Sequence, residues 1–336
     1  MIGVIGDDNG RVILQLGMLR CSVSAIEFTL CISLQLFEGI GMDARYEEKT
    51  FESYFNNELD RKASIYFPLG QVQEGVVGLD SAAHSKNWRL WRKLGYPFRL
   101  SPPFSGVELK DIANEMEHYL GKEVHNIPAM KVNLLFQYKR PQFITMSSGA
   151  EWQLWNRKYF RYSLYAEQHA LLSHIEATFG QDAVVLYAAP AVEDVSDLVK
   201  LKKARTIIDN TNYRRASELN GHHRNTYIKA GTYSQACSEP ERIENFSLIE
   251  LIENTEPKAQ RDNGQLLIEF AKRINLSMLE AKGIGYLGTA FVERMSQFKE
   301  YELERFSLFF AILTMSVFRE VTGCQWIIPL SSSPNA

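Results

Sequence analysis

Residues 183–188 constrain the fold more than any other part of the chain. This segment reads Ala-Val-Val-Leu-Tyr-Ala, contains no charged residue, and is ended by Pro190. A continuous apolar run of this length is typical of a strand that is buried on both faces in the middle of a sheet. Because both faces of such a strand must be covered by other elements, the run predicts a layered α/β fold.

Three further elements are predicted upstream of this strand. Apolar residues at four-residue spacing predict a helix that begins near Thr50, and they are Phe51, Phe55 and Leu59. Residues 75–80 predict a short strand that ends at Asp80. Residues 132–141 predict a second strand, which is apolar at first, becomes polar towards its end, and stops at a proline.

A second helix is predicted just before the buried strand. Ser163 is a suitable N-cap and Gly180 a suitable C-cap. The residues between them that follow helical spacing are Leu164, Gln168, Leu171, Leu172, Ile175 and Phe179. The predicted order is therefore helix, strand, strand, helix, strand.

The chain divides into three predicted regions. Residues 1–42 form an N-terminal β extension, because Asp8-Asn9-Gly10 between two apolar runs is a hairpin signal. This extension is either a β element added to the domain or sequence upstream of a start at Met42. Residues 43–235 form the α/β core, with an insertion at 81–131 that contains a helix over 107–120. Residues 236–336 form a mostly helical region suited to oligomerisation or contact with a partner subunit.

Composition and charge restrict the class of protein. The chain has 336 residues, of which 45% are hydrophobic and 23% charged, with a formal net charge of -3. These values describe a globular chain and exclude fibrous and wholly disordered ones. Any nucleic-acid surface must then be a local patch. Four scattered cysteines and an apolar run of only about twelve residues at 307–318 favour a cytoplasmic protein without a transmembrane segment.

Polar residues at the ends of two predicted strands carry the candidate chemistry. Asp80 ends one strand, while Gln137 and Lys139 lie two apart, and so on one face, near the end of the other. If the two strands are neighbours, a carboxylate, an amide oxygen and an ammonium point into one cleft. Phosphodiester hydrolysis with Mg²⁺ uses such groups. Glu52 on the first helix and Glu74 before the Asp80 strand are rival candidates for a second carboxylate.

These residues resemble a known family. Gly78-Leu79-Asp80 and Phe136-Gln137-Tyr138-Lys139, followed by a helix and a buried strand, are similar to the PD-(D/E)XK nuclease superfamily in its Gln-x-Lys form. The resemblance covers roughly residues 50–190. It implies a restriction-endonuclease-like mixed sheet flanked by helices, and Mg²⁺ or Mn²⁺ held by Asp80, Gln137 and Glu52. It also implies that Lys139 assists the hydrolytic water.

Two basic patches suggest contacts with DNA. The first lies in the insertion, where tryptophans interleave with basic residues that include Arg89, Arg92 and Lys93. The second comprises Lys202, Lys203, Arg214 and Arg215, with few acidic residues nearby. Both patches predict contacts with the phosphate backbone.

Two weaker motifs have simpler interpretations. His222 and His223 are adjacent and point to opposite faces of an extended chain, which disfavours a shared metal ion. Residues 283–288 match Gly-x-Gly-x-x-Gly, but a helical pattern precedes them where dinucleotide binding needs a strand. We expect this segment to be a turn between helices.

The sequence therefore predicts a metal-dependent nuclease that acts on DNA, in a role such as restriction or phage defence. The alternative is a catalytically inactive protein of the same fold that binds nucleic acid or a partner protein. Gln137 favours this alternative, because a neutral side chain leaves less negative charge to hold a divalent cation. A helical interaction subunit that works through residues 236–336 is a third interpretation.

Overall fold

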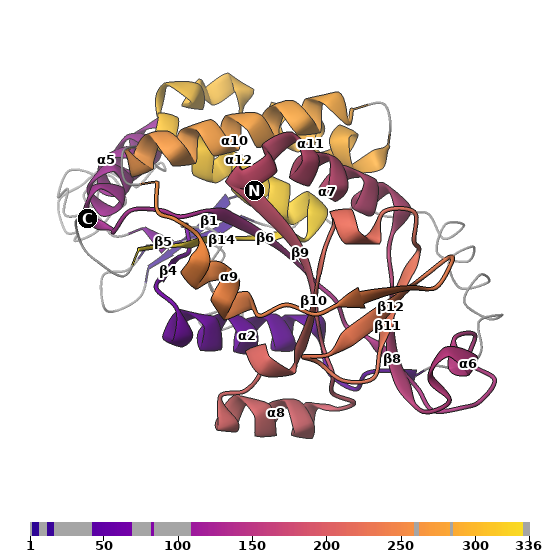
Figure 1. Cartoon of the computed structure of the whole chain (residues 1–336). Helices are drawn as coiled ribbons and strands as arrows, with labels where there is room; N and C mark the ends of the chain where they lie inside the picture. The colour runs from indigo at the N-terminus through magenta and orange to yellow at the C-terminus, as the bar shows by residue number, and fades with distance from the viewer. Residues whose placement is uncertain are drawn as a thin grey trace.

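A computed structural model describes residues 2–6, 12–16, 42–68, 82–83, 109–258, 262–282 and 285–331. Within these ranges the chain has the mixed α/β architecture expected from the sequence, with a central sheet between two layers of helices (Figure 1). A second sheet packs beside the central one.

The central sheet has five strands in the order β10-β9-β6-β14-β4. Its middle strands β6 and β9 are parallel, and every other pair is antiparallel. All eight residues of β9 are buried, which confirms the strand that the apolar run predicted. The bounds are β4 (Ile65–Tyr66), β6 (Asn133–Tyr138), β9 (Ala183–Pro190), β10 (Thr211–Arg215) and β14 (Gln325–Pro329).

Helices cover both faces of this sheet. On one face lie α2 (Glu48–Lys62) and α8 (Val195–Ala204), and the predicted stripe of α2 packs against Phe136 and Tyr138 of β6. On the other face lie α7 (Ala166–Phe179), α10 (Asn263–Glu280) and α12 (Ser307–Thr322) (Figure 1). Because strand side chains alternate between faces, the odd-numbered residues of β6 point towards α7 and α12.

The second sheet has six strands, all antiparallel, in the order β13-β12-β11-β8-β7-β3. The packing of Tyr162 and Tyr227 against Tyr187 and Ala189 of β9 joins it to the core. Its strands are β3 (Met42–Asp43), β7 (Gln142–Ile144), β8 (Tyr159–Ser163), β11 (Arg224–Tyr227), β12 (Tyr233–Cys237) and β13 (Glu241–Glu244). A short helix, α6 (Trp152–Trp155), lies between β7 and β8.

The remaining α-helices and strands lie in the insertion and towards the two ends of the chain, and short 3-10 helices occur between elements. The helix expected at 107–120 is α5 (Leu109–Asn126), and the expected hairpin is the pair β1 (Ile2–Gly6) and β2 (Val12–Leu16), with β5 (Ala82–Ala83) beside β2. The other helices are α9 (Leu248–Asn254) and α11 (Tyr286–Ser296). Short 3-10 helices are η1 (Gly180–Asp182), η2 (Ile208–Asn210), η3 (Ser217–Leu219), η4 (Lys299–Tyr301) and η5 (Leu303–Arg305).

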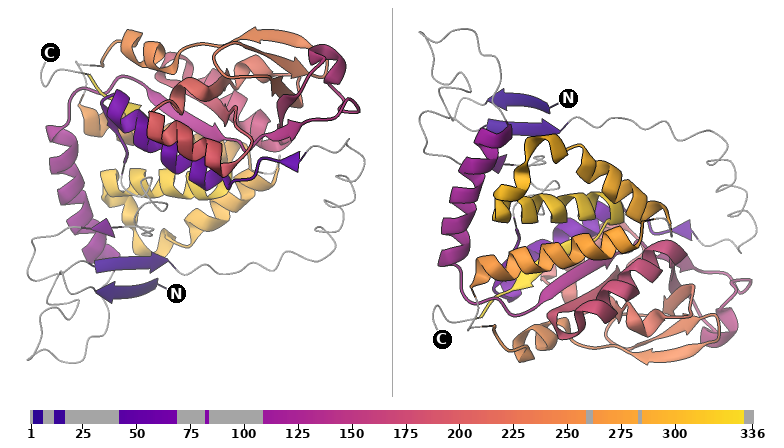
Figure 2. Two further views of the ribbon diagram at one scale, coloured as in Figure 1. Left: turned by 90° about the horizontal axis from the view of Figure 1, so that it is seen from below. Right: turned by 90° about the horizontal axis from the view of Figure 1, so that it is seen from above.

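Two sequence-based expectations need correction. The expected N-cap Ser163 is the last residue of β8, and α7 begins only at Ala166, although Gly180 does cap its other end with φ of +55°. The region after residue 235 is mostly helical, but its final strand β14 pairs with β6 in the central sheet. In the described part of the chain β6 pairs with β9 on one side and with β14 on the other, while the strand expected over 75–80 lies outside the described residues. Figure 2 shows α10 and α12 lying over the sheet that β14 joins, and α11 packs against these two helices.

Asp182 connects the C-terminal helices to the core. Its carboxylate accepts hydrogen bonds from Lys258 Nζ at 2.6 Å and from Arg273 Nη1 at 2.9 Å. The hydrogen bond from Lys258, followed by the charges of Lys258 and Arg273, holds the pKa of Asp182 below its usual 3.8. Because the pKa is depressed in the folded state, the ionised form contributes stability above pH 3.8, and this contribution is lost as pH falls through the folded-state pKa.

We expect Asp182→Asn to lower the free energy of unfolding at pH 7, by no more than about 1 kcal/mol because the site is partly exposed. The difference from the wild type should disappear in acid, below the depressed pKa. Urea unfolding at both pH values checks this. Asp60→Asn on the exposed side of α2 is the matched control, and an equal effect of both substitutions would contradict the role of Asp182.

Candidate functional site

The candidate site lies where β6 ends. Gln137 is near the end of β6 and Lys139 follows it, and only 5% and 6% of their respective surfaces are exposed. Both residues point towards the α7 side of the sheet, as their spacing predicted. The first turn of α2, the first turn of α7 and the last turn of α12 all reach this end of the strand. Polar groups from four elements, β6, α2, α7 and α12, therefore meet at the C-terminal end of this strand.

Gln168 links the two predicted residues. Its amide nitrogen donates to Gln137 Oε1 at 3.0 Å and to the carbonyl oxygen of Thr322 at 2.7 Å. Its amide oxygen accepts a hydrogen bond of 3.2 Å from Lys139 Nζ. The structure thus places Gln137 and Lys139 in one network, as expected, although they meet through a third side chain. Cys324 Sγ donates to the same Gln137 oxygen at 3.3 Å.

Lys139 is a buried cation at the centre of this network. Its ammonium lies 4.8 Å from the ring centroid of Tyr165 and 5.7 Å from that of Tyr187. Burial lowers the pKa of Lys139, while the nearby Glu48 carboxylate opposes that shift. The aromatic faces and Glu48 stabilise the charged form that burial disfavours.

The two glutamates of α2 are in different environments. Glu52, the predicted residue, is buried and forms ion pairs with Arg319 at 2.6 Å and Lys49 at 3.0 Å. Glu48, one helical turn earlier, accepts a hydrogen bond from the backbone N–H of Arg140 at 3.2 Å. Burial raises the pKa of Glu48, and the charge of Lys139 opposes that rise. Glu48 is therefore the carboxylate that interacts with Lys139, and the sequence analysis missed it.

The other predicted acids cannot be placed beside this network. Asp80 and Glu74 lie outside the described residues. The position beside β6 that the Asp80 strand was expected to occupy belongs to β14, whose Gln325 pairs with Phe136. Thr322 and Cys324, just before β14, supply the polar groups on that side.

The described part of this site does not by itself fit a hard divalent cation. Glu48 and Glu52 supply two carboxylates, but three cationic side chains surround them: Lys49, Lys139 and Arg319. Gln137 Oε1 already accepts two hydrogen bonds. Within the described ranges, no three His, Cys, Asp or Glu side chains are grouped so that they could hold a metal ion. Mg²⁺ and Mn²⁺ prefer an excess of anionic oxygen ligands, which the described residues at this site do not supply.

The second basic patch does not form one surface. Arg214 is fully buried, and its guanidinium donates to Ser234 Oγ and to the carbonyl oxygens of Ile243 and Glu244, so its assignment to DNA binding is wrong. Arg215 is partly exposed and lies 3.8 Å from Glu176. Lys202 and Lys203 are exposed at the end of α8, where the Lys202 ammonium lies 3.8 Å from the ring centroid of Tyr54. The first patch, with Arg89, Arg92 and Lys93, lies outside the described residues.

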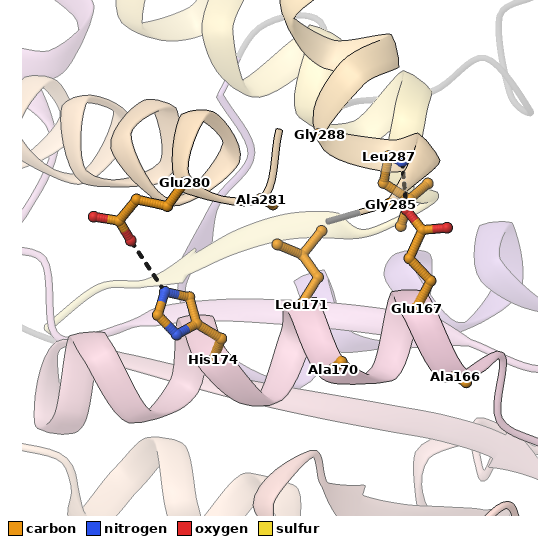
Figure 3. A pocket seen from close by; sticks show the side chains of 10 residues that line it. All are labelled: Ala166, Glu167, Ala170, Leu171, His174, Glu280, Ala281, Gly285, Leu287 and Gly288. Carbon is orange, nitrogen blue, oxygen red and sulfur yellow. Dashed lines mark hydrogen bonds and ion pairs between the residues drawn. The ribbon is translucent and has the colours of Figure 1, made fainter. Parts of the chain in front are cut away.

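A hollow of about 470 Å³ lies on the other side of α7, against the segment that joins α10 to α11 (Figure 3). Glu167 Oε1 accepts a hydrogen bond of 2.5 Å from the backbone N–H of Leu287, and His174 Nε2 lies 3.3 Å from Glu280. A Cβ at Gly288 would lie 2.5 Å from the backbone of Ala281, so glycine is needed for this close approach. Of the Gly-x-Gly-x-x-Gly segment expected as a turn, Gly285 is the N-cap of α11, residues 286–288 form its first turn, and residues 283–284 lie outside the described residues.

The adjacent histidines have separate partners. His222 Nε2 lies 3.2 Å from Glu241, and His223 Nδ1 lies 2.7 Å from Ser238 Oγ. Each imidazole therefore contacts a different side chain.

Comparison of the chain with protein-family models, curated proteins and solved structures gives no match. Among the described helices, none combines the length and the apolar character needed to cross a bilayer. The geometry at the end of β6 is therefore the main basis for a function.

Two of the missed site residues, Gln168 and Glu48, could have been found from the sequence pattern. Gln168 is a polar residue inside an otherwise apolar helical stripe, and a polar side chain at such a position needs a buried partner. Glu48 shares a helix face with Glu52, because the two are four residues apart. Arg319 and Cys324 could not be found in this way, since they reach the site only through the long-range pairing of β14.

Proposed function

We propose that the chain is a metal-dependent nuclease that hydrolyses phosphodiester bonds in DNA, with a restriction-endonuclease-like core and a role in restriction or phage defence. The observation that carries the proposal is the convergence of Gln137, Lys139 and a glutamate of α2 at the end of β6. The parallel pair β6 and β9, with helices on both faces, supports it, because ligands of open α/β sheets bind at the carboxyl ends of such strands.

The side chains at this site suit phosphate hydrolysis. The ammonium of Lys139, little screened because it is buried, would stabilise negative charge that develops on the phosphoryl oxygens. Glu48, whose pKa is raised by burial, would take the proton of the attacking water. Gln168 positions Lys139 through its amide oxygen. The first turns of α2 and α7 add the partial positive charge of two helix N-termini.

The metal requirement belongs to the proposal as well. In the PD-(D/E)XK family that the sequence resembles, Mg²⁺ or Mn²⁺ polarises the scissile phosphate. The described residues supply only two carboxylates, and lysine and arginine side chains surround them. A bound Mg²⁺ or Mn²⁺ would therefore need further carboxylates, such as Asp80 or Glu74. Metal dependence is therefore the property to measure first.

The test is incubation of the purified protein with supercoiled, linear and single-stranded DNA at low salt in Mg²⁺, Mn²⁺ or EDTA. We expect cleavage with metal, none with EDTA, and a loss of at least about 100-fold in Asp80→Asn and in Glu48→Gln. Glu250→Gln on the exposed side of α9 is the control and should cleave normally. Cleavage that persists in EDTA would contradict the metal requirement, and no cleavage by the wild type would contradict the nuclease.

A second candidate is a catalytically inactive protein of this fold that binds nucleic acid or a partner. The pairing of both Glu52 oxygens with Arg319 and Lys49 favours it, because a carboxylate held in this way is not available to a metal or a water. This candidate predicts DNA binding that is unaffected by Asp80→Asn.

We further propose that the C-terminal helices mediate oligomerisation or contact a partner subunit. Three large apolar side chains on α10 and α11 are exposed: Leu276, Leu279 and Tyr286. Exposed apolar side chains on neighbouring helices are typical of contact surfaces.

A further inference from the structure

A hollow of about 610 Å³ lies between the second sheet and α8, beyond the carboxyl end of β9. Its walls come from β7, β8, the segment after β9, and α8. Phe143 and Phe160 form an aromatic wall, and Arg157, Lys158 and Lys200 are the cations that line it. A nucleotide is within the size range of ligands that cavities of this volume hold. None of these five residues was singled out by the sequence analysis.

The charge of this hollow is positive. Arg157 and Lys158 are exposed, and neither has an ion pair with any residue that the structure describes. Asn156, with φ of +52°, turns the chain just before them. The two acids in the lining are already paired, Asp197 with Lys200 at 2.7 Å and Glu193 with Arg45 at 3.2 Å. Two cations thus remain to bind an anion.

The aromatic wall lies beside one of these cations. Phe143 and Phe160 stack with their ring centroids 4.7 Å apart and their planes 28° from parallel. Phe143 is the more exposed of the two. The Lys158 ammonium lies 5.9 Å from the Phe143 ring centroid. Because Phe160 stacks on the Phe143 ring and the Lys158 ammonium lies over it, a planar group placed on Phe143 would displace that ammonium, which would then be free to pair with an anion attached to the same group.

We propose that this hollow binds an unpaired nucleotide of a DNA strand, with its base on Phe143 and its phosphate on Arg157 and Lys158. A base offers a flat apolar face and a phosphate offers the anion, and single-strand binding sites combine these two contacts. The choice of DNA as the ligand rests on the proposed function. Phe143 follows Lys139 by four residues in the sequence.

The test measures binding and does not depend on cleavage. Fluorescence anisotropy of a fluorescein-labelled 20-mer of dT is followed in EDTA, from low to moderate salt, with the full-length protein. We expect Arg157→Ala/Lys158→Ala to weaken binding about tenfold or more, and to reduce the slope of log affinity against log salt by about 0.7, the contribution of one phosphate contact on a single strand. Lys122→Ala/Lys272→Ala, two exposed cations elsewhere, is the matched control.

Phe143→Leu tests the base contact. It should weaken binding of the dT strand by about fivefold or more and leave the salt slope unchanged, because stacking is lost while the phosphate contacts remain. Circular dichroism of the variant shows whether it folds, and Phe143→Tyr, which keeps an aromatic face, should restore binding.

Three results would overturn the proposal. These are wild-type affinity in the Arg157/Lys158 double variant, an equal loss in the Lys122/Lys272 control, and binding of duplex DNA in preference to the dT strand. Binding that behaves as expected in a protein without nuclease activity would uphold the hollow and reject the proposed function, so the two can fail separately.

Discussion

Lys139→Met is expected to lower the rate of DNA cleavage by at least about 100-fold while the protein stays folded. The ammonium is the only part of the side chain that can stabilise charge on a phosphate, and removing one such group from a buried site has this effect on rate. Methionine retains the length and apolar stem of lysine. Because burial disfavours the charged form, we expect the free energy of unfolding to fall by no more than about 1 kcal/mol.

The pH dependence of the wild type provides a second measurement. Burial lowers the pKa of Lys139 from its usual 10.5, so the ammonium loses its proton at a lower pH than an exposed lysine would. If the charged form is required, cleavage should decline on the alkaline side before pH 10.5. The effect of rising pH on stability is opposite to its effect on cleavage. Deprotonation removes the cost of burying a charge. The free energy of unfolding should therefore increase as pH rises through the folded-state pKa of Lys139.

Lys131→Met is the matched control for Lys139→Met. Lys131 is also buried, at the other end of β6, and its ammonium donates to the carbonyl oxygens of Ile252 and Glu253. Its replacement should lower stability by about 1–3 kcal/mol, because two buried acceptors lose their donor, and should leave cleavage intact. If Lys131→Met reduces cleavage as much as Lys139→Met does, the effect at Lys139 reflects general damage to the fold and carries no evidence of a role in the site.

The sequence predicted correctly those elements whose spacing of apolar residues reflects which of their faces are buried. The strand β9 is apolar at every position because helices or strands cover both of its faces, and α2 shows a stripe because one face of it packs on β6. In each case the local sequence contains the whole signal. The convergence of Gln137 and Lys139 could be predicted for the same reason, since residues two apart on a strand share a face.

The pairing of distant segments could not be predicted in this way. The strand beside β6 comes from residues 325–329, almost two hundred positions downstream, and nothing in the local pattern of either strand specifies that partner. The local pattern favoured the strand ending at Asp80 as the neighbour of β6. Arg319 and Cys324 entered the site with β14 and were missed with it.

The four residues of the second basic patch show a related limit. A count of positive charges treats Arg214 and Arg215 alike, although they are adjacent on a strand and therefore point in opposite directions. Arg215 is partly exposed, whereas Arg214 is fully buried between the two sheets. Its guanidinium joins β10 of the central sheet to β12 and β13 of the second sheet through Ser234 and the carbonyl oxygens of Ile243 and Glu244. Its position makes it a structural residue.

We therefore expect Arg214→Ala to lower the free energy of unfolding by about 3–5 kcal/mol. The substitution leaves several buried acceptors without a donor and opens a cavity between the sheets. Burial lowers the pKa of Arg214, but an arginine pKa remains far above neutral pH, so the charge that these acceptors stabilise is present under all ordinary conditions.

Arg215→Ala is the matched control, since it removes the same side chain one residue later. It should change the free energy of unfolding by less than about 1 kcal/mol, because its ion pair is long and partly exposed. Urea unfolding followed by circular dichroism measures both variants, and DNA binding is compared at a temperature where both are folded. Loss of DNA binding in Arg214→Ala with unchanged stability would show that the guanidinium contacts DNA after all. A large loss of stability with Arg214→Ala alone would establish that a buried arginine, and not an electrostatic surface, accounts for this part of the basic sequence.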